Sequence, residues 1–169
     1  TDTIQLLNLN REPLMNIIDI NHFLETKVLD RPVSLFQADI ESHEEELTKN
    51  IGGKSVLVIG GAGTIGSSFI RAILNYKPSK LHVVDTNENG LTELTRSLRS
   101  KINQFIPNDY KTYPMNFGDV VFQKLFRNEG GYDIVANFAA HKHVRSEKDH
   151  YAIEAMLDNN VFKEIKSLE

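Results

Sequence analysis

Hydrophobic positions follow two different patterns along this chain, and the pattern changes near residue 50. In the first part, four apolar residues recur at helical spacing: Ile17, Ile20, Leu24 and Val28. This spacing predicts an amphipathic helix over residues 17–29, which ends before the proline of the stretch 30–33 because proline disfavours helix at the preceding residue. A second short helix is expected over residues 39–50. We therefore predict an N-terminal helical arm that spans residues 1–50.

From residue 51 to residue 169, short strand-forming runs alternate with helical periods. Strands are expected over residues 55–60, 80–85, 110–117 and 132–139. Helices are expected over residues 64–76, 89–104 and 120–128, with a last helix that begins near Ala152. Apolar strands joined by helices form parallel sheets that are covered on both faces. The predicted fold class is therefore α/β, a Rossmann-type doubly wound parallel sheet.

Composition narrows the range of possible functions. The 169 residues are 40% apolar and 25% charged, which suits one globular domain with a buried core. The net charge of -4 and the pI near 5.9 argue against a nucleic-acid partner, since phosphate binding needs a clustered basic face. The longest unbroken apolar run is about five residues, far below the ~20 of a membrane span. The sequence has no cysteine, which excludes disulfides and is compatible with the cytoplasm.

Four glycines stand where the first predicted strand meets the following helix: Gly60, Gly61, Gly63 and Gly66. They fit GxGxxG when counted from Gly61 and GxxGxxG when counted from Gly60. In either spacing an early glycine makes a tight turn, Gly63 lets the backbone approach a pyrophosphate, and Gly66 lets the helix pack on the strand. The amides of Thr64 and Ile65 would face the phosphates at the positive end of the helix dipole. The pattern predicts a dinucleotide site at the carboxyl ends of the strands.

An acidic residue ends the second predicted strand. Asp85 stands nineteen residues after Gly66, about where a dinucleotide site places a carboxylate against the adenosine ribose hydroxyls. The alternative is a carboxylate that caps the following turn. Because a carboxylate here repels a ribose 2'-phosphate, the predicted cofactor is NAD rather than NADP.

Four segments resemble the extended short-chain dehydrogenase/reductase superfamily: GGAGTIG, VVDTNENGLTEL, NFGDV and NFAAHKHVRSEKDHYAIEAMLDNNVF. Within it, AAHKHV followed by AIEAMLDNN looks most like the polysaccharide-biosynthesis nucleotide-sugar 4,6-dehydratases that act on UDP-N-acetylglucosamine. The similarity covers residues of about 30–162. It implies the NAD-binding portion of a cytoplasmic, homo-oligomeric lyase of bacterial surface polysaccharide or glycan sugar biosynthesis.

The resemblance also implies cofactor contacts around the second and third strands. Asp119 and Val120 would touch the adenine, although Asp119 could equally cap the helix that follows it. Asn87, in the segment that begins before Asp85, is expected to join the same site.

Further contacts are implied after the fourth strand. Asn137, Ala139 and Ala140 would line the cofactor. Lys142 would hold the nicotinamide ribose, with a solvated loop cation as the alternative. Either Asn159 or Asn160 would help to organise the active site, or both occupy ordinary polar helix positions.

These enzymes use a Tyr-x-x-x-Lys pair, in which the tyrosine exchanges a proton with the sugar and the lysine lowers the tyrosine pKa. The one formal match, Tyr76 with Lys80, straddles a helix end and a strand start at the sheet edge opposite the cofactor. Pro78 also breaks the helical turn that would bring both side chains onto one face. We assign no catalytic residue within this chain and expect cofactor binding without turnover.

Other interpretations stay open. Three histidines near each other in the sequence, His141, His143 and His150, suggest a metal site. No cysteine or aligned carboxylate completes such a site, so no metal is predicted. A dinucleotide-binding module without catalysis and a nucleotide-sugar epimerase of the same superfamily are the alternative functions.

Overall fold

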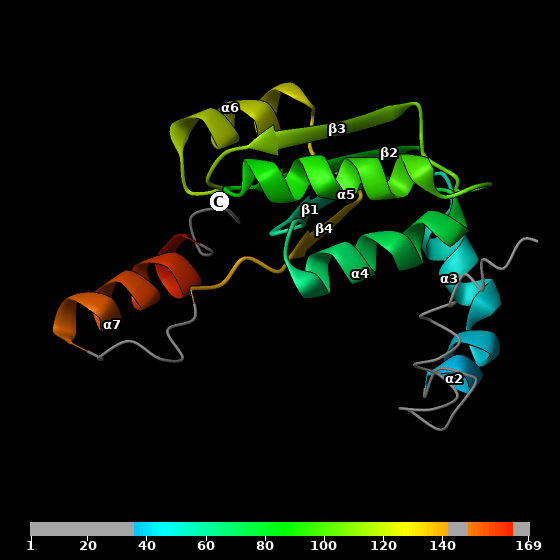
Figure 1. The fold of residues 1–169 in the computed structure, drawn as a ribbon, viewed down its shortest axis with the longest axis horizontal. Helices are drawn as coiled ribbons and strands as arrows, with labels where there is room; N and C mark the ends of the chain where they lie inside the picture. Colours follow the sequence, from blue (N-terminus) through cyan, green and yellow to red (C-terminus); the bar gives the residue numbers. More distant parts are fainter. Residues whose placement is uncertain (1–35, 142–148, 164–169) are drawn as a thin grey trace, which may run out of the picture. The chain divides into compact units, whose positions relative to one another are not determined.

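The computed structural model describes residues 36–141 and 149–163 (Figure 1). The expected helix over residues 17–29, Lys142 and His143 lie outside the described residues. The chain divides into two compact units, Thr1–His43 and Glu44–Glu169, each described by itself. The predicted boundary near residue 50 stays a prediction.

The helix expected over residues 39–50 is two helices, α2 (Gln37–Ser42) and α3 (Glu44–Ile51). His43 separates them, and its Nδ1 lies 2.8 Å from the carbonyl oxygen of Asp39. Local side-chain hydrogen bonds of this kind compete with helix continuation.

The second unit contains one sheet of four parallel strands in the order β3-β2-β1-β4. The strands are β1 (Ser55–Ile59), β2 (Lys80–Asp85), β3 (Asp109–Pro114) and β4 (Ile134–Asn137). The chain moves outward from β1 to β2 and β3, then returns to the other side of β1 for β4. This is the predicted Rossmann-type fold, and such a sheet leaves a crevice at the carboxyl ends of the strands where the order reverses.

Helices follow each strand and cover both faces of the sheet. They are α4 (Thr64–Ile73) with the 3-10 turn η2 (Leu74–Tyr76), α5 (Glu88–Ser100) and α6 (Val120–Asn128). Helices α4 and α5 lie next to each other (Figure 1) and share one core with Val56 and Val58 of β1. The alternate β1 residues, Leu57 and Ile59, belong to a second core with Phe122 of α6. Both faces are therefore covered, as the sequence predicts for a parallel sheet.

Helices α4 and α5 end earlier than predicted. After Ile73 the chain tightens into η2, and Lys77 then adopts a left-handed φ of 56° before Pro78. After Ser100 the chain leaves the helix, and Asn103 has a φ of 63°. The helical spacing of apolar residues extends past Ile73 because Leu74 is also buried. Leu74 lies in the 3-10 turn, so the spacing predicted a longer α4 than the structure has.

The last described elements are α7 (His150–Leu157) and a π-helical turn, η3 (Asp158–Phe162). Helix α7 begins two residues before the predicted start, because the Asp149 side chain accepts a hydrogen bond from the Ala152 N–H at 2.8 Å and caps the helix. Among the described helices, none combines the length and the apolarity needed to cross a bilayer.

Candidate functional site

A pocket of ≈ 220 Å³ opens at the carboxyl ends of the strands. Its lining comes from the ends of β1 and β2, the loops after all four strands, and η3: Ile59, Gly60, Gly63, Val84, Asp85, Thr86, Met115, Asn116, Phe117, Phe138, Ala139, Ala140, His141 and Asn159. The pocket thus lies at the edge that the sequence predicts, beside the point where the strand order reverses.

The glycine loop owes its path to Gly60 and Gly66. Gly60 has a φ of 75°, and a Cβ there would lie 2.5 Å from the backbone nitrogen of Ala139. A Cβ on Gly66 would collide with the carbonyl oxygen of Gly60, so only glycine lets α4 start this close to β1. A Cβ on Gly61 would meet the Val83 side chain in the first core. The glycine of the tight turn, Gly60, and the glycine of the close helix approach, Gly66, are therefore the first and last glycines of the GxxGxxG spacing.

Gly63 differs from its neighbours because it has room. Its φ is -71°, a Cβ would meet only the Gly60 carbonyl oxygen at 3.4 Å, and the residue lines the pocket. Gly63 is the N-cap of α4 and has no side chain to satisfy the first amides of the helix. Thr64 and Ile65 carry two of these amides and are exposed, although neither lines the pocket. Free amides and the positive dipole end make this helix start suitable for a phosphate.

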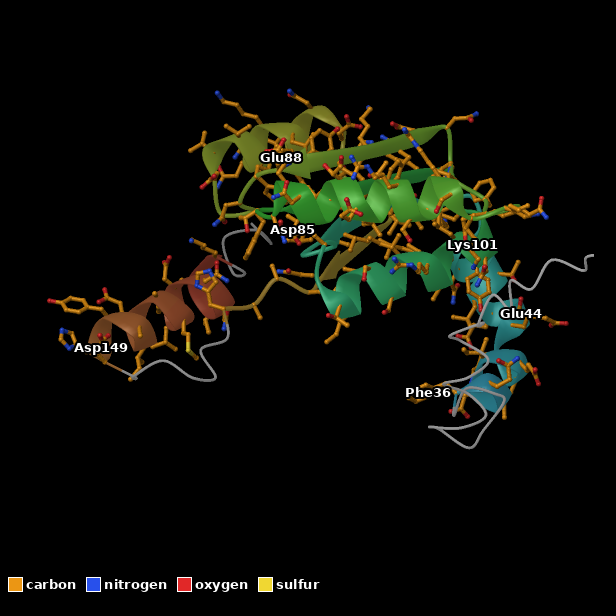
Figure 2. All side chains as sticks on the ribbon, in the orientation of Figure 1. Phe36, Glu44, Asp85, Glu88, Lys101 and Asp149 are labelled. Atoms are coloured by element: carbon orange, nitrogen blue, oxygen red, sulfur yellow. The ribbon has the colours of Figure 1, made fainter. Side chains whose placement is uncertain are left out.

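Asp85 connects the glycine loop to the next helix. Its Oδ2 accepts a hydrogen bond from the Ala62 N–H at 2.9 Å, and its Oδ1 accepts one from the Asn87 N–H at 2.9 Å. Figure 2 shows Asp85 and Glu88 at one end of the sheet and Lys101 at the other. Asp85 caps its own turn and also lines the pocket, so the two interpretations of this residue are compatible.

Seven of the described predicted contacts lie outside the pocket lining: Thr64, Ile65, Gly66, Asn87, Asp119, Val120 and Asn137. The Asn87 Oδ1 accepts a hydrogen bond from the Gly90 N–H at 3.0 Å and caps α5. Asp119 occupies the N-cap position of α6, but its side chain makes no capping hydrogen bond. Asp119 and Val120 are exposed.

The loop after β4 brings other predicted residues to the pocket. Ala139 and Ala140 line it, and the Asn137 Oδ1 accepts a hydrogen bond from the Ala139 N–H at 2.9 Å. Asn137 therefore shapes the loop, while Lys142 lies outside the described residues. Phe138 and His141 are additional lining residues.

The strands expected over residues 110–117 and 132–139 are shorter in the structure. Several residues that were expected to extend them line the pocket instead. After β3 ends at Pro114, Met115, Asn116 and Phe117 leave the ladder and line the pocket. Phe117 stays buried in the second core, so apolarity continues after strand pairing stops. The sequence analysis did not identify Asn116, whose Oδ1 accepts the Gly118 N–H at 2.8 Å.

Tyr76 and Lys80 lie away from the pocket. Tyr76 ends η2 and donates a hydrogen bond to Glu44 at 3.3 Å. Lys80 begins β2, whereas the pocket forms at Asp85, where β2 ends. The Lys80 ammonium instead contacts Glu129 at 2.8 Å.

A polar network at the amino ends of the strands was missed by the sequence analysis. His82 is fully buried, with Nδ1 2.8 Å from the Tyr132 hydroxyl and Nε2 3.1 Å from the Asp109 carboxylate. The hydrogen bond from His82 and the nearby Lys111 lower the pKa of Asp109 to about 2. The sequence feature that could have indicated this network is the pair Lys80 and His82, two polar residues that are two positions apart in a mainly apolar strand.

His82, Asp109 and Glu129 lie close enough to share a cation, with ligand atoms within 4.8 Å of one another. Two ammonium groups already neutralise this cluster, since Lys80 pairs with Glu129 and Lys111 lies 3.1 Å from Asp109. The hydrogen bond from Lys80 also lowers the pKa of Glu129. The cluster therefore joins β2, β3 and the end of α6 as a structural ion-pair network.

The sequence profile of the polysaccharide biosynthesis protein family matches residues 56–167 of this chain. An uncharacterized membrane protein of Methanocaldococcus jannaschii is 38% identical over 93 residues, which are 54% of this chain and 25% of that protein. The probable polysaccharide biosynthesis protein EpsC of Bacillus subtilis is 29% identical over 114 residues, which are 68% of this chain and 19% of that protein. The chain thus spans a quarter or less of the length of these curated relatives.

Solved structures share the fold. The Bordetella bronchiseptica enzyme WbmF, solved in complex with NAD+ and UDP, superposes with a TM-score of 0.52 and 20% identity. The match covers 71% of this chain and 32% of that chain. A likeness at this level of identity supports the Rossmann-type fold.

Proposed function

Because this chain belongs to the polysaccharide biosynthesis protein family, we propose that it is the NAD-binding portion of a nucleotide-sugar 4,6-dehydratase. The observation that carries the proposal is the pocket at the strand-order reversal, where Gly60, Gly63 and Asp85 meet. The enzyme would act on UDP-N-acetylglucosamine, as the sequence resemblance implies. That resemblance also implies a homo-oligomer and a cytoplasmic location, and both are part of this proposal.

The pocket fits the adenosine and pyrophosphate parts of NAD. Gly63 leaves the space that a Cβ would take, which lets a pyrophosphate approach the α4 amides. Asp85 still has lone pairs for ribose hydroxyls after accepting two backbone N–H groups, and its charge repels a 2'-phosphate. WbmF, which has a similar fold, is known with NAD+ and UDP bound, and this supports the choice of cofactor.

When bound, NAD supplies reversible hydride transfer, so that hydride leaves C4 of the sugar, water is lost across C5 and C6, and hydride returns at C6. The described residues of this chain contribute binding and orientation. Gly63 and the start of α4 receive the phosphates, Asp85 holds a ribose, and the loop at Ala139 and Ala140 forms the opposite wall. We place the proton-transfer tyrosine and lysine outside these 169 residues.

The test compares this chain with a version extended through a carboxyl-terminal Tyr-x-x-x-Lys. We expect the extended protein to convert UDP-N-acetylglucosamine to a 4-keto-6-deoxy sugar, seen by mass spectrometry as the loss of one water, without consumption of added NAD. The 169-residue chain should bind NAD+ and show no turnover. A product of unchanged mass would identify an epimerase, and NAD+ binding without turnover in the extended protein would favour a binding module. Turnover by the shorter chain would refute our placement of the active site.

A further inference from the structure

Two segments that are far apart in the sequence both contribute to the pocket lining. Asn116 and Phe117 come from the loop after β3, and Asn159 comes from η3. Phe117 is 5% exposed and belongs to the second core, so the loop after β3 is fixed on the sheet. The exposed residue Asn160 joins η3 to the loop after β4 through the backbone of His141. A pocket of fixed width also needs a connection between η3 and the loop after β3.

Lys163, which directly follows η3, makes this connection. A Cβ built on Gly118 would lie 2.6 Å from the Lys163 Cδ and 3.0 Å from both its Cγ and its Cε. Three successive methylene groups therefore approach the same point, so the lysine stem lies across Gly118. Lysine can bury its stem while its ammonium group stays in water, and the Lys163 side chain is 27% exposed. The stem thus brings η3 into contact with the loop after β3.

The close approach of this stem is what requires glycine at residue 118. The φ of Gly118 lies outside the left-handed region, so its backbone conformation is open to other residues. The three atoms nearest to a Cβ at this position all belong to Lys163. The Gly118 N–H donates to the Asn116 Oδ1 at 2.8 Å, which fixes the glycine in the turn that carries the pocket residues. A methyl group on Gly118 would therefore displace the lysine stem.

The Lys163 ammonium group has a separate partner. Its Nζ lies 3.4 Å from the Asp158 Oδ2, and the Asp158 side chain is 53% exposed. Exposed ion pairs contribute little to stability. Asp158 begins η3, so this pair lies within one helical segment and joins it to no other. The packing of the stem, and not the charge, therefore holds η3 against the loop after β3.

We propose that Lys163 is a positioning residue whose aliphatic stem holds η3 against the loop after β3 and so sets the width of the pocket for the dinucleotide. The inference rests on the proposed function. Because the two sides of the pocket are held before the cofactor arrives, binding needs less ordering and the affinity is higher. Lys163 is outside the pocket lining, so it acts through the lining residues of the two segments that it joins.

The test measures the Kd for NAD+ by calorimetry in the full chain and in its variants, beside urea unfolding. Lys163→Ala removes the stem and should raise the Kd about three- to tenfold, because η3 must then be ordered on binding. Lys163→Met keeps an unbranched stem without the charge and should restore a Kd close to that of the wild type. Lys124→Ala is the matched control and should bind as the wild type does, since Lys124 is exposed on α6 and does not line the pocket.

A double variant tests the contact itself. Gly118→Ala should raise the Kd because its methyl group displaces the lysine stem. In the Lys163→Ala background the same substitution should cause no further loss of affinity, since the atoms that the methyl group would meet are gone. Additive losses would show that Gly118 and Lys163 act separately, and they would overturn the inference.

The remaining outcomes separate the inference from the proposed function. A wild type and a Lys163→Ala variant that bind NAD+ equally well would overturn the inference alone, even if the variant unfolds at a lower urea concentration. Tighter binding by Lys163→Ala would show that the stem obstructs the pocket, and a Lys163→Met variant as weak as Lys163→Ala would assign the effect to the ammonium group. Either result would overturn the role of the stem. A wild type that does not bind NAD+ would overturn the proposed function and the inference with it.

Discussion

Single residues of the glycine loop have separable roles, and alanine substitution distinguishes them. Gly60→Ala forces a positive φ on alanine and a contact of 2.5 Å with the Ala139 nitrogen, so we expect the free energy of unfolding to fall by about 2 kcal/mol or more. Gly63→Ala should cost about 1 kcal/mol or less because its φ is -71° and its nearest contact 3.4 Å. Its methyl group should instead weaken NAD+ binding, measured by calorimetry beside urea unfolding.

Gly130→Ala is the control for backbone strain alone, since Gly130 has a φ of 73° and no other atom lies within 4 Å of the place that a methyl group would take. It should cost about 1 kcal/mol. If Gly60→Ala proved no more destabilising than Gly130→Ala, the close approach of Gly60 to the loop after β4 would not be what requires glycine.

Cofactor choice depends on Asp85. In Asp85→Asn the charge that repels a 2'-phosphate is gone, and one acceptor oxygen facing a backbone N–H becomes an NH2 group. We expect weaker binding of NAD+ and a smaller preference for NAD+ over NADP+, measured as the ratio of the two Kd values. Glu88→Gln removes a charge at the same end of the sheet (Figure 2) without touching the pocket lining. An equal change of the Kd ratio in Glu88→Gln would mean that the overall negative charge near the pocket, and not Asp85 itself, sets the preference for NAD+.

The sequence predicted several residues that spacing brings to the pocket, and their contact with a cofactor stays a prediction. Gly60 and Asp85 lie where β1 and β2 end and Gly63 is the N-cap of α4, so strand position and glycine spacing bring them to one edge. Asn159 was named only as one of two possibilities, because its direction depends on the η3 turn and on the hydrogen bonds of Asn160. Tertiary contacts set the direction of such a side chain, and they produce no periodic pattern of residue types from which it could be predicted.

At the level of whole elements, the centres of all four strands were predictable, whereas the ends of β3 and β4 were not. The apolar run of β2 coincides with its predicted limits, because both neighbours in the sheet pair along its length. β4 has a neighbour on one side among the described strands, and it pairs over four residues only. Tyr132, which the predicted range 132–139 includes, lies before β4, and its hydroxyl is 2.8 Å from the His82 Nδ1. At these ends, burial therefore continues where strand pairing does not.

The network that joins β2, β3 and α6 predicts a pH dependence of stability. Asp109 has its pKa lowered from 3.8 to about 2 by His82 and Lys111. A lowered carboxyl pKa stabilises the fold above the unfolded-state value, so this contribution is complete above about pH 4 and is lost as the pH falls towards 2. We expect the wild type to lose more free energy of unfolding between about pH 5 and about pH 2.5 than Asp109→Asn does.

Urea unfolding at the two pH values measures the difference, and Glu93→Gln is its control. Glu93 pairs with Arg96 at the surface, with 70% of its side chain exposed, so its removal should leave the acid loss of stability nearly as in the wild type. Parallel losses in the wild type and in Asp109→Asn would mean that other carboxylates govern acid unfolding.

At the scale of the whole molecule, the two units differ in how much apolar sequence they contain for building a core. Among the described residues, every member of the two cores and of the pocket lies at residue 51 or beyond, within the unit Glu44–Glu169. The amphipathic pattern of residues 17–29 is by contrast too short to form a core of its own. The N-terminal arm therefore stays a prediction of the sequence, while the α/β unit follows from both sequence and structure.

Deleting residues 1–43 tests this division. We expect residues 44–169 to unfold cooperatively with a Tm close to that of the full chain and to keep its Kd for NAD+, because none of the core or pocket residues that the structure describes is removed. We expect the apolar stripe of residues 17–29 to pack against a partner subunit. The deletion should therefore change the oligomeric mass measured by light scattering. A deletion that leaves the mass unchanged would refute the role of the arm in assembly. One that abolishes NAD+ binding while the far-UV circular dichroism remains would show that the pocket needs the first unit, and the proposed boundary of the binding domain would then be wrong.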